Sequence, residues 1–214
     1  METLTAENLD IIEESARNFA ETYIRPDFMD WDETQHFPVD LFRKLGEHGF
    51  MGVLVPEKYM GSGLGYQEYI SIIVEISKVC GSIGLSVAAH NSLCTNHILQ
   101  FGTEEQRLKW IPKLATGEWI GAWGLTESNT GSDAMRMQVI AEDKGDHWEL
   151  NGAKNWITNS PIADVFVVWA KSDGHDNKIR GFVLEKGMKG LNAPKIEGKF
   201  SLRASITGMI QMDE

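Results

Sequence analysis

The hydrophobic pattern of this chain changes period near residue 119, and this change constrains the fold more than any other feature. Before it, apolar residues recur at helical spacing, and the first run comprises Ile12, Ala16, Phe19 and Tyr23. After it, short apolar runs alternate with turn residues, which is typical of strands. The sequence therefore predicts an α+β fold, with an all-helical domain over residues 1–118 and a small β-barrel or sandwich domain over residues 119–214.

The first half is predicted to contain five helices. The first is expected to follow Thr5 as its N-cap and to end before Pro26, and the others are expected over residues 38–49, 67–80, 82–100 and 103–117. The last of these opens with Thr103-Glu-Glu-Gln106, a capping-box pattern in which two side chains bond each other's free backbone N–H groups. The helix over 82–100 is rich in small residues, which suits a position where backbones approach closely.

The second half is predicted to contain an extended segment near Met135, Met137 and Ile140, followed by short strands. These strands are expected over residues 147–150, 155–158, 164–169, 180–184 and 208–212. Asn151-Gly152 is a strong hairpin signal. The chain stops directly after the last strand, from which we expect it to be the front part of a longer protein.

Composition excludes several classes of partner. A net charge of −11 without any run of Lys or Arg argues against nucleic acid and anionic membrane, and no stretch approaches the ~20 apolar residues of a membrane span. Cys80 and Cys94 are predicted to be buried, reduced thiols. The acidic N-terminus lacks a targeting pattern, so a cytoplasmic location is expected, although a processed protein of the mitochondrial matrix would look the same.

Two patterns resemble sites but are interpreted as structural. Gly61-Ser-Gly-Leu-Gly65 lacks the spacing and the βαβ context of a dinucleotide fingerprint, so it is predicted to be a loop between helices. His90 and His97 have no acidic residue or further histidine at metal-ligand spacing, so we expect packing or capping histidines and no metal site.

The most informative segments are Trp123-Gly-Leu-Thr-Glu-Ser-Asn-Thr-Gly-Ser-Asp133 and Asn155-Trp-Ile-Thr-Asn159. The first is a strand entering a loop of small and hydroxylic residues, which exposes backbone N–H groups that can bind a planar ring edge or a phosphate. The second places an indole beside the hydroxyl of Thr158, an arrangement that can hold a flavin. A hairpin with an aromatic core residue remains an alternative from the spacing alone.

These segments resemble the acyl-CoA dehydrogenase family, and the likeness covers the whole chain. Gly124-Leu-Thr-Glu127 and Gly131-Ser-Asp133 match one family signature, and Asn151 to Asn159 match a second. The resemblance implies a helical N-terminal domain and a middle β domain, with the family's C-terminal four-helix bundle absent from this chain. It also implies FAD as cofactor, held by Trp123, Leu125, Thr126, Gly131, Ser132, Trp156, Ile157 and Thr158, with Ser132 also contacting the CoA moiety of the substrate.

The activity that the resemblance implies is α,β-dehydrogenation of an acyl-CoA thioester to the trans-2-enoyl-CoA. In the family a glutamate removes the α-proton, the β-hydrogen passes to FAD as hydride, and electrons leave to an electron-transferring flavoprotein. That glutamate is expected beyond Glu214, so no catalytic residue is named and this chain alone is expected to be inactive. The parent protein is expected to be a homotetramer or homodimer.

The subfamily signals conflict. Ser128, Thr130 and Arg136 depart from the family pattern, and Arg136 is expected either to clash with a ligand or to form a salt bridge with it. The middle domain looks closest to glutaryl-CoA dehydrogenases, whereas the N-terminal part resembles general short-chain or branched-chain enzymes. Residues 78–86 lack the Arg that would pair a distal carboxylate, which disfavours glutaryl-CoA. The alternatives are a glutaryl-CoA dehydrogenase-type enzyme, a non-catalytic FAD- and acyl-CoA-binding module, and a structural protein that binds no flavin.

Overall fold

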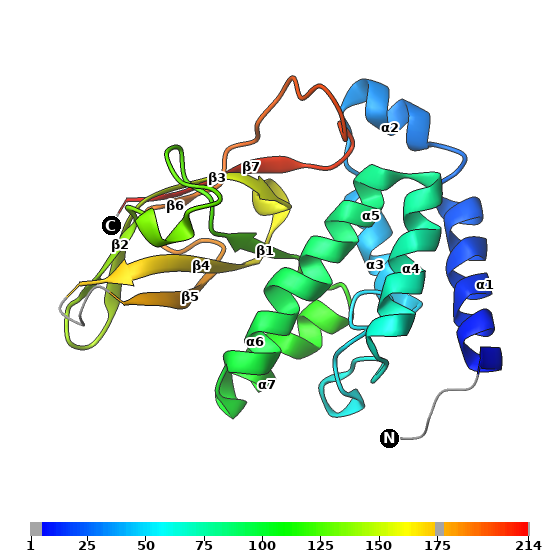
Figure 1. The fold of residues 1–214 in the computed structure, drawn as a ribbon, viewed down its shortest axis with the longest axis horizontal. Helices are drawn as coiled ribbons and strands as arrows, with labels where there is room; N and C mark the ends of the chain where they lie inside the picture. Colours follow the sequence, from blue (N-terminus) through cyan, green and yellow to red (C-terminus); the bar gives the residue numbers. More distant parts are fainter. Residues whose placement is uncertain (1–5, 174–177, 214) are drawn as a thin grey trace.

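The structure, a computed structural model, describes residues 6–173 and 178–213, so the predicted N-cap Thr5 lies outside the described residues. A helical half stands beside a β-sheet half (Figure 1). The α-helices are α1 (Ala6–Tyr23), α2 (Phe28–Thr34), α3 (Val39–Glu47), α4 (Tyr66–Val79), α5 (Gly81–Ala88), α6 (Asn96–Phe101) and α7 (Glu104–Ala115). The predicted α+β class is therefore confirmed.

The helical half follows the predicted runs, with two differences. The sequence pattern missed α2, because seven residues with a single buried side chain, Trp31, give too short a periodic signal. The predicted helix over 82–100 is interrupted by a π-helical segment, η2 (Ala89–Thr95), between α5 and α6. A π turn adds a residue to the helical repeat and is often found at functional sites.

Local signals that depend on specific side chains are confirmed. At the start of α7, the Gln106 N–H donates to Thr103 Oγ1 at 3.2 Å, and the Thr103 N–H donates to Gln106 Oε1 at 2.8 Å. The segment from Gly61 to Gly65 is a loop that precedes α4, as predicted. Cys80 and Cys94 are both buried free thiols.

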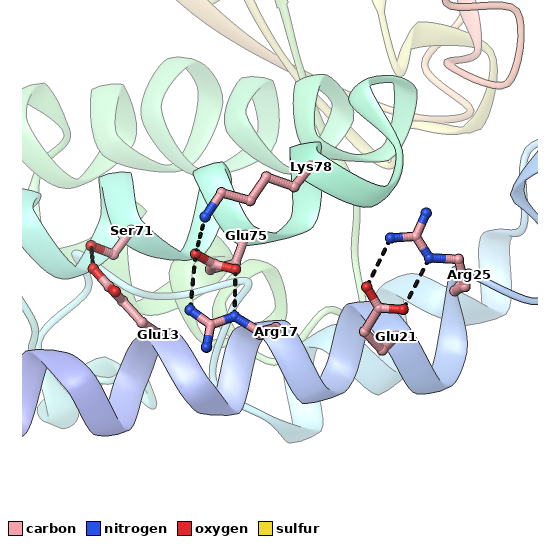
Figure 2. Close-up of polar contacts among 7 residues, drawn as sticks. All are labelled: Glu13, Arg17, Glu21, Arg25, Ser71, Glu75 and Lys78. Atoms are coloured by element: carbon pink, nitrogen blue, oxygen red, sulfur yellow. Dashed lines mark hydrogen bonds and ion pairs between the residues drawn. The ribbon is translucent and has the colours of Figure 1, made fainter.

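A buried carboxylate ties α1 to α4 (Figure 2). Glu75 on α4 accepts a hydrogen bond from Arg17 Nε of α1 at 3.0 Å and another from Lys78 Nζ at 2.5 Å. These bonds, the one from Arg17 above all, hold the pKa of Glu75 below its ordinary value despite burial, so the carboxylate stays ionised. The apolar faces of α1 and α4 also pack together. The bond between Arg17 and Glu75 adds a polar contact that fixes how the two helices are aligned.

The β half is one seven-stranded mixed sheet with the order β1-β4-β2-β3-β7-β6, in which β5 also pairs with β4. Its strands are β1 (Gly121–Gly124), β2 (Ile140–Asp143), β3 (Trp148–Thr158), β4 (Val165–Ser172), β5 (Ile179–Glu185), β6 (Leu191–Asn192) and β7 (Thr207–Met212). β1 runs parallel to β4, whereas β2 and β7 run antiparallel to β3. Within the described ranges the edge strands of the sheet do not pair with each other. The sheet is therefore not a closed barrel, which was one of the two forms predicted for the β domain.

The hairpin predicted at Asn151-Gly152 is wrong, because both residues lie inside the long strand β3. The turn between β2 and β3 lies earlier, where the Lys144 N–H donates to His147 O at 3.0 Å. Gly152 has φ 130°, and it stands where β3 leaves β2 and begins to pair with β7. The freedom of glycine at positive φ therefore bends a strand here instead of closing a turn.

The helical and β halves share a core. One cluster of buried residues combines the apolar face of α7 and Cys94 of η2 with Val165 and Val167 of β4. The loop before β7 also reaches α2 (Figure 1), where Arg203 Nε donates to Asp32 Oδ2 at 2.8 Å. Because the core is continuous across the junction, the packing marks no domain boundary there. The division between residues 118 and 119 therefore stays a prediction. None of the helices in the described ranges is long and apolar enough to cross a membrane.

Candidate functional site

Six of the eight residues predicted to hold a cofactor line one pocket of about 170 Å³. They come from β1 and the loop after it, and from the end of β3: Trp123, Leu125, Thr126, Trp156, Ile157 and Thr158. Ala89 and Leu93 of η2 complete the lining. Small-molecule sites usually enclose about 300–1,000 Å³, so this pocket is smaller than a typical site, and we call its lining residues one wall of the candidate site.

Hydrogen bonds bring the two segments of this wall together although about 30 residues separate them in the chain. The Asn155 N–H of β3 donates to Thr126 O at 2.8 Å, and Lys154 Nζ donates to Leu125 O at 3.2 Å. Asn155 Nδ2 also donates to Ser128 Oγ at 2.8 Å. The loop after β1 therefore lies along β3 with Thr126 and Thr158 facing the same pocket.

Trp156 is held in an unusual backbone conformation. Its φ is 63°, and the pairing of β3 with β7 shifts register between Lys154 and Ile157, as in a β-bulge. A bulky residue in the left-handed region costs about 1–3 kcal/mol and persists only where the surrounding fold imposes it. The bulge leaves the side chain 64% exposed, so the indole is presented at the mouth of the pocket instead of in the core.

The pocket offers polar groups that the protein leaves unused. Among the described residues, no side-chain hydrogen bond involves the hydroxyl of Thr126 or Thr158, and both residues are partly exposed. Hydroxyl groups can donate or accept, so they can bond the heteroatoms at the edge of a planar ring. Beside an indole face, this donor set fits the ring system of a flavin.

The structure does not bring Gly131 and Ser132 into the pocket. Both are exposed in the loop between β1 and β2, and a side chain at Gly131 would meet nothing within 4 Å. Arg136, which the sequence placed near a ligand, is likewise exposed. The assignment of Gly131 and Ser132 to cofactor and CoA binding therefore stays a prediction.

Glu127 lies beside the pocket but is not free to act as a base. Its carboxylate accepts from Lys154 Nζ at 2.7 Å and from the N–H groups of Gln138 and Val139 at 2.6 and 3.0 Å. Burial alone would raise the pKa of Glu127, but the hydrogen bond from Lys154 and those from the two N–H groups hold it below its ordinary value. A carboxylate that accepts from three donors is a poor proton acceptor.

The two histidines of the small-residue segment pack, as the sequence predicted. His90 is fully buried, accepts from the Gly121 N–H at 3.0 Å and donates from Nε2 to Leu114 O at 3.0 Å. Burial lowers the pKa of His90 to about 4, so the ring is neutral. His97 packs its ring against Trp123 and Trp169. Within the described ranges, no three His, Cys, Asp or Glu residues gather as metal ligands.

The sequence did not single out η2 as part of the pocket. The side chains of η2 point in two directions. Ala89 and Leu93 line the pocket, whereas His90 and Cys94 face β1. Contact with β1 is so close that a Cβ on Gly121 would stand 2.6 Å from Cys94 Sγ. The small-residue composition was the available signal, but it cannot tell which face meets which neighbour.

A larger cavity, of about 540 Å³, lies away from the predicted residues. It is lined by α6, α7, β3, β4 and β5, and none of the described residues that line it is Asp, Glu, Lys or Arg. Trp123 links it to the smaller pocket through its ring contacts with His97 and Trp169. We place the candidate site at the smaller pocket because the unpartnered hydroxyls and the strained Trp156 lie there.

Comparison with known proteins identifies both halves of the chain. The profile described as "Acyl-CoA dehydrogenase, N-terminal domain" matches residues 6–118, and that described as "Acyl-CoA dehydrogenase, middle domain" matches residues 122–214. A curated relative, the short-chain specific acyl-CoA dehydrogenase of Clostridium acetobutylicum, is 42% identical over 200 residues, which are 92% of this chain and 53% of the relative. The chain spans about half the length of the curated relatives it matches.

Two solved structures have nearly the same fold. A chain from the study of the electron transferring flavoprotein of Acidaminococcus fermentans superposes with a TM-score of 0.94 at 40% identity, covering 100% of this chain and 57% of that chain. The glutaryl-CoA dehydrogenase of Mycobacterium smegmatis in complex with FADH2 superposes with a TM-score of 0.93 at 34% identity, covering 98% of this chain and 53% of that chain. The resemblance inferred from the motifs is therefore confirmed.

Proposed function

This chain belongs to the acyl-CoA dehydrogenase family, and we propose that it forms the flavin-facing wall of an enzyme that oxidises an acyl-CoA thioester to the trans-2-enoyl-CoA with FAD. One observation carries the proposal. The two family motifs, which lie far apart in the sequence, meet at a pocket that combines an exposed indole with two unpartnered hydroxyls.

The residues of the pocket fit the FAD ring system. Trp156 can lie against a flat ring, and the hydroxyls of Thr126 and Thr158 can bond its heteroatoms. When bound, FAD supplies the acceptor for hydride. The protein's part is to orient the ring, to exclude water with Ala89 and Leu93, and to aim preorganised donors at developing charge. We assign no general base to this wall, because Glu127 is fully engaged.

For the substrate, we propose a short acyl-CoA without a distal carboxylate. The residues of η2 that line the pocket, Ala89 and Leu93, are apolar. Lys78, the one cation in the stretch 78–86, is bonded to Glu75 and is not available to pair a substrate carboxylate. A buried carboxylate without a partner costs several kcal/mol, which disfavours glutaryl-CoA.

We further propose the partners that family membership implies. An electron-transferring flavoprotein would accept the electrons, and the parent protein would be a homotetramer or homodimer. Bacterial and mitochondrial relatives both exist, so the cytoplasm and the mitochondrial matrix are the two compartments to test.

Titration of the 214-residue chain with FAD tests the proposed site. Binding is expected to quench tryptophan emission, and Trp156→Leu is expected to weaken FAD binding roughly 3- to 10-fold, because ring stacking contributes about 0.5–1.5 kcal/mol. Phe200→Leu is the matched control, since Phe200 is a fully exposed aromatic residue outside the pocket. Equal FAD affinities of wild type and Trp156→Leu would contradict the proposal that the flavin binds against this wall.

Anaerobic addition of butyryl-CoA to the FAD-loaded full-length parent protein separates the activity from binding, because the 214-residue chain alone is expected to be inactive. Bleaching of the flavin absorbance supports dehydrogenation, and a larger response to butyryl-CoA than to glutaryl-CoA supports the proposed substrate class. Tight stoichiometric binding of FAD and acyl-CoA without bleaching would instead favour the non-catalytic module. A chain that binds neither ligand would favour the structural alternative.

A further inference from the structure

We propose that Lys154 and Glu127 are positioning residues, whose buried ion pair locks the loop after β1 onto β3 and so sets the spacing between Thr126 and Trp156 across the pocket. The inference rests on the proposed function, because it explains how the flavin-facing wall keeps its shape. Neither residue lines the pocket, so each acts through its neighbours.

Lys154 joins the two segments directly. Its side chain is completely buried, and Nζ donates to Glu127 Oε1 at 2.7 Å and to Leu125 O at 3.2 Å. Leu125 is itself a lining residue of the pocket. One ammonium group on β3 thus holds both the backbone and a side chain of the opposite segment.

Glu127 closes the loop on its other side. The N–H groups of Gln138 and Val139 donate to its carboxylate at 2.6 and 3.0 Å. These bonds hold the two ends of the loop between residues 127 and 138 together. A turn stabilises this start, since the Glu127 N–H donates to Thr130 O at 2.8 Å. The carboxylate therefore fixes the chain on both sides of the loop that carries Gly131 and Ser132.

The pair stands next to the strained part of β3. Lys154 is the last residue before the register shift, and Asn155, which follows it, donates its N–H to Thr126 O. Trp156 comes next, at φ 63°. A displacement of Lys154 would therefore also move the indole of Trp156, and it would disturb the hydrogen bond from the Asn155 N–H that holds Thr126 in place.

Stability alone does not account for an ion pair at this place. Desolvation of two charges offsets much of their attraction, and well-packed apolar residues of similar volume are often equally stable. Apolar replacements would supply neither the bond to the Leu125 carbonyl nor the acceptors for the two N–H groups. The pair thus provides geometry that an apolar core would not.

The test compares the FAD affinity and melting temperature of Lys154→Met, Glu127→Gln and the double variant. Each single variant is expected to lose at least tenfold in FAD affinity and to melt at a lower temperature, because it leaves a buried group without its charged partner. The double variant carries no unpaired charge, so its melting temperature is expected to recover while its FAD affinity stays at least tenfold below that of wild type. Recovery of affinity together with melting temperature would overturn the proposal.

A ligand-free measurement keeps the two proposals separate. Amide hydrogen exchange at Asn155, Gln138 and Val139 is expected to accelerate at least tenfold in the variants, relative to wild type without FAD. If a single variant does not fold, the double variant decides by the same measurement. Unchanged exchange at these amides overturns the positioning role. Failure of wild type to bind FAD instead counts against the proposed function.

Glu75→Gln is the matched control. Glu75 is also a buried carboxylate that accepts from two cations, but it lies between α1 and α4 (Figure 2). It is expected to leave FAD affinity and exchange at residues 138, 139 and 155 unchanged. A tenfold loss of affinity in this variant would show that any buried ion pair produces the effect, and the specific role of Lys154 and Glu127 would be withdrawn.

Discussion

Replacing Gly121 with alanine is expected to lower the free energy of unfolding by about 3 kcal/mol. A Cβ at this position would stand 2.6 Å from Sγ and 2.7 Å from Cβ of Cys94, so β1 and η2 would have to separate. Separation would also stretch the bond from the Gly121 N–H to His90 and the bond from Asn159 Nδ2 to Gly121 O. Urea denaturation of wild type and variant measures the loss.

Two comparisons show whether the clash with Cys94 is the cause. Gly131→Ala should change stability by less than about 0.5 kcal/mol, because a Cβ there meets nothing within 4 Å. Combining Cys94→Ala with Gly121→Ala should cost less than the sum of the single changes, since the sulfur is then absent. Strict additivity of the two changes would contradict the proposed contact.

Acidification between pH 6.5 and pH 4 is expected to remove about 3 kcal/mol of stability through His90 alone. Burial lowers the pKa of His90 from 6.5 to about 4, and both ring nitrogens are used by the neutral form. Because the folded-state pKa lies below the unfolded one, the contribution is complete above pH 6.5. This contribution to stability is lost as the pH falls toward 4, because the histidine of the unfolded chain becomes protonated while His90 in the folded chain stays neutral.

The measurement is the difference in unfolding free energy between wild type and His90→Gln from pH 7 to pH 4. Glutamine has no titrating group, so the difference should shrink by about 3 kcal/mol over this range. His147 also titrates here, but Asp146 raises its pKa, which gives the opposite slope, and it is present in both proteins. A constant difference across the range would show that His90 is not held neutral by burial.

The elements that sequence predicted well are those with a local cause. Helices α1, α3 and α4 follow from repeated apolar spacing, and the start of α7 follows from two side chains that bond each other's backbone. Asn151-Gly152 failed for the opposite reason. The conformational freedom of glycine is local, but whether it closes a turn or bends a strand depends on β7, which lies some 55 residues further along the chain.

The candidate site could be predicted only in part. The two motifs supplied Trp156, Thr126 and Thr158, and the structure brings these together. Sequence could not show that Glu127 is occupied by Lys154 or that η2 contributes Leu93, because both depend on contacts between distant segments. Nor did it indicate that Gly131 and Ser132 would stand apart from the pocket.

The left-handed backbone at Trp156 has a consequence for directed evolution. Asn tolerates this conformation far better than an aromatic residue, and little burial would be lost because the indole is mostly exposed. Trp156→Asn should therefore raise the melting temperature while FAD affinity falls. A library screened for heat resistance would discard Trp156 early, whereas one screened for retained flavin colour would keep it, so the two selections would drive the same position in opposite directions.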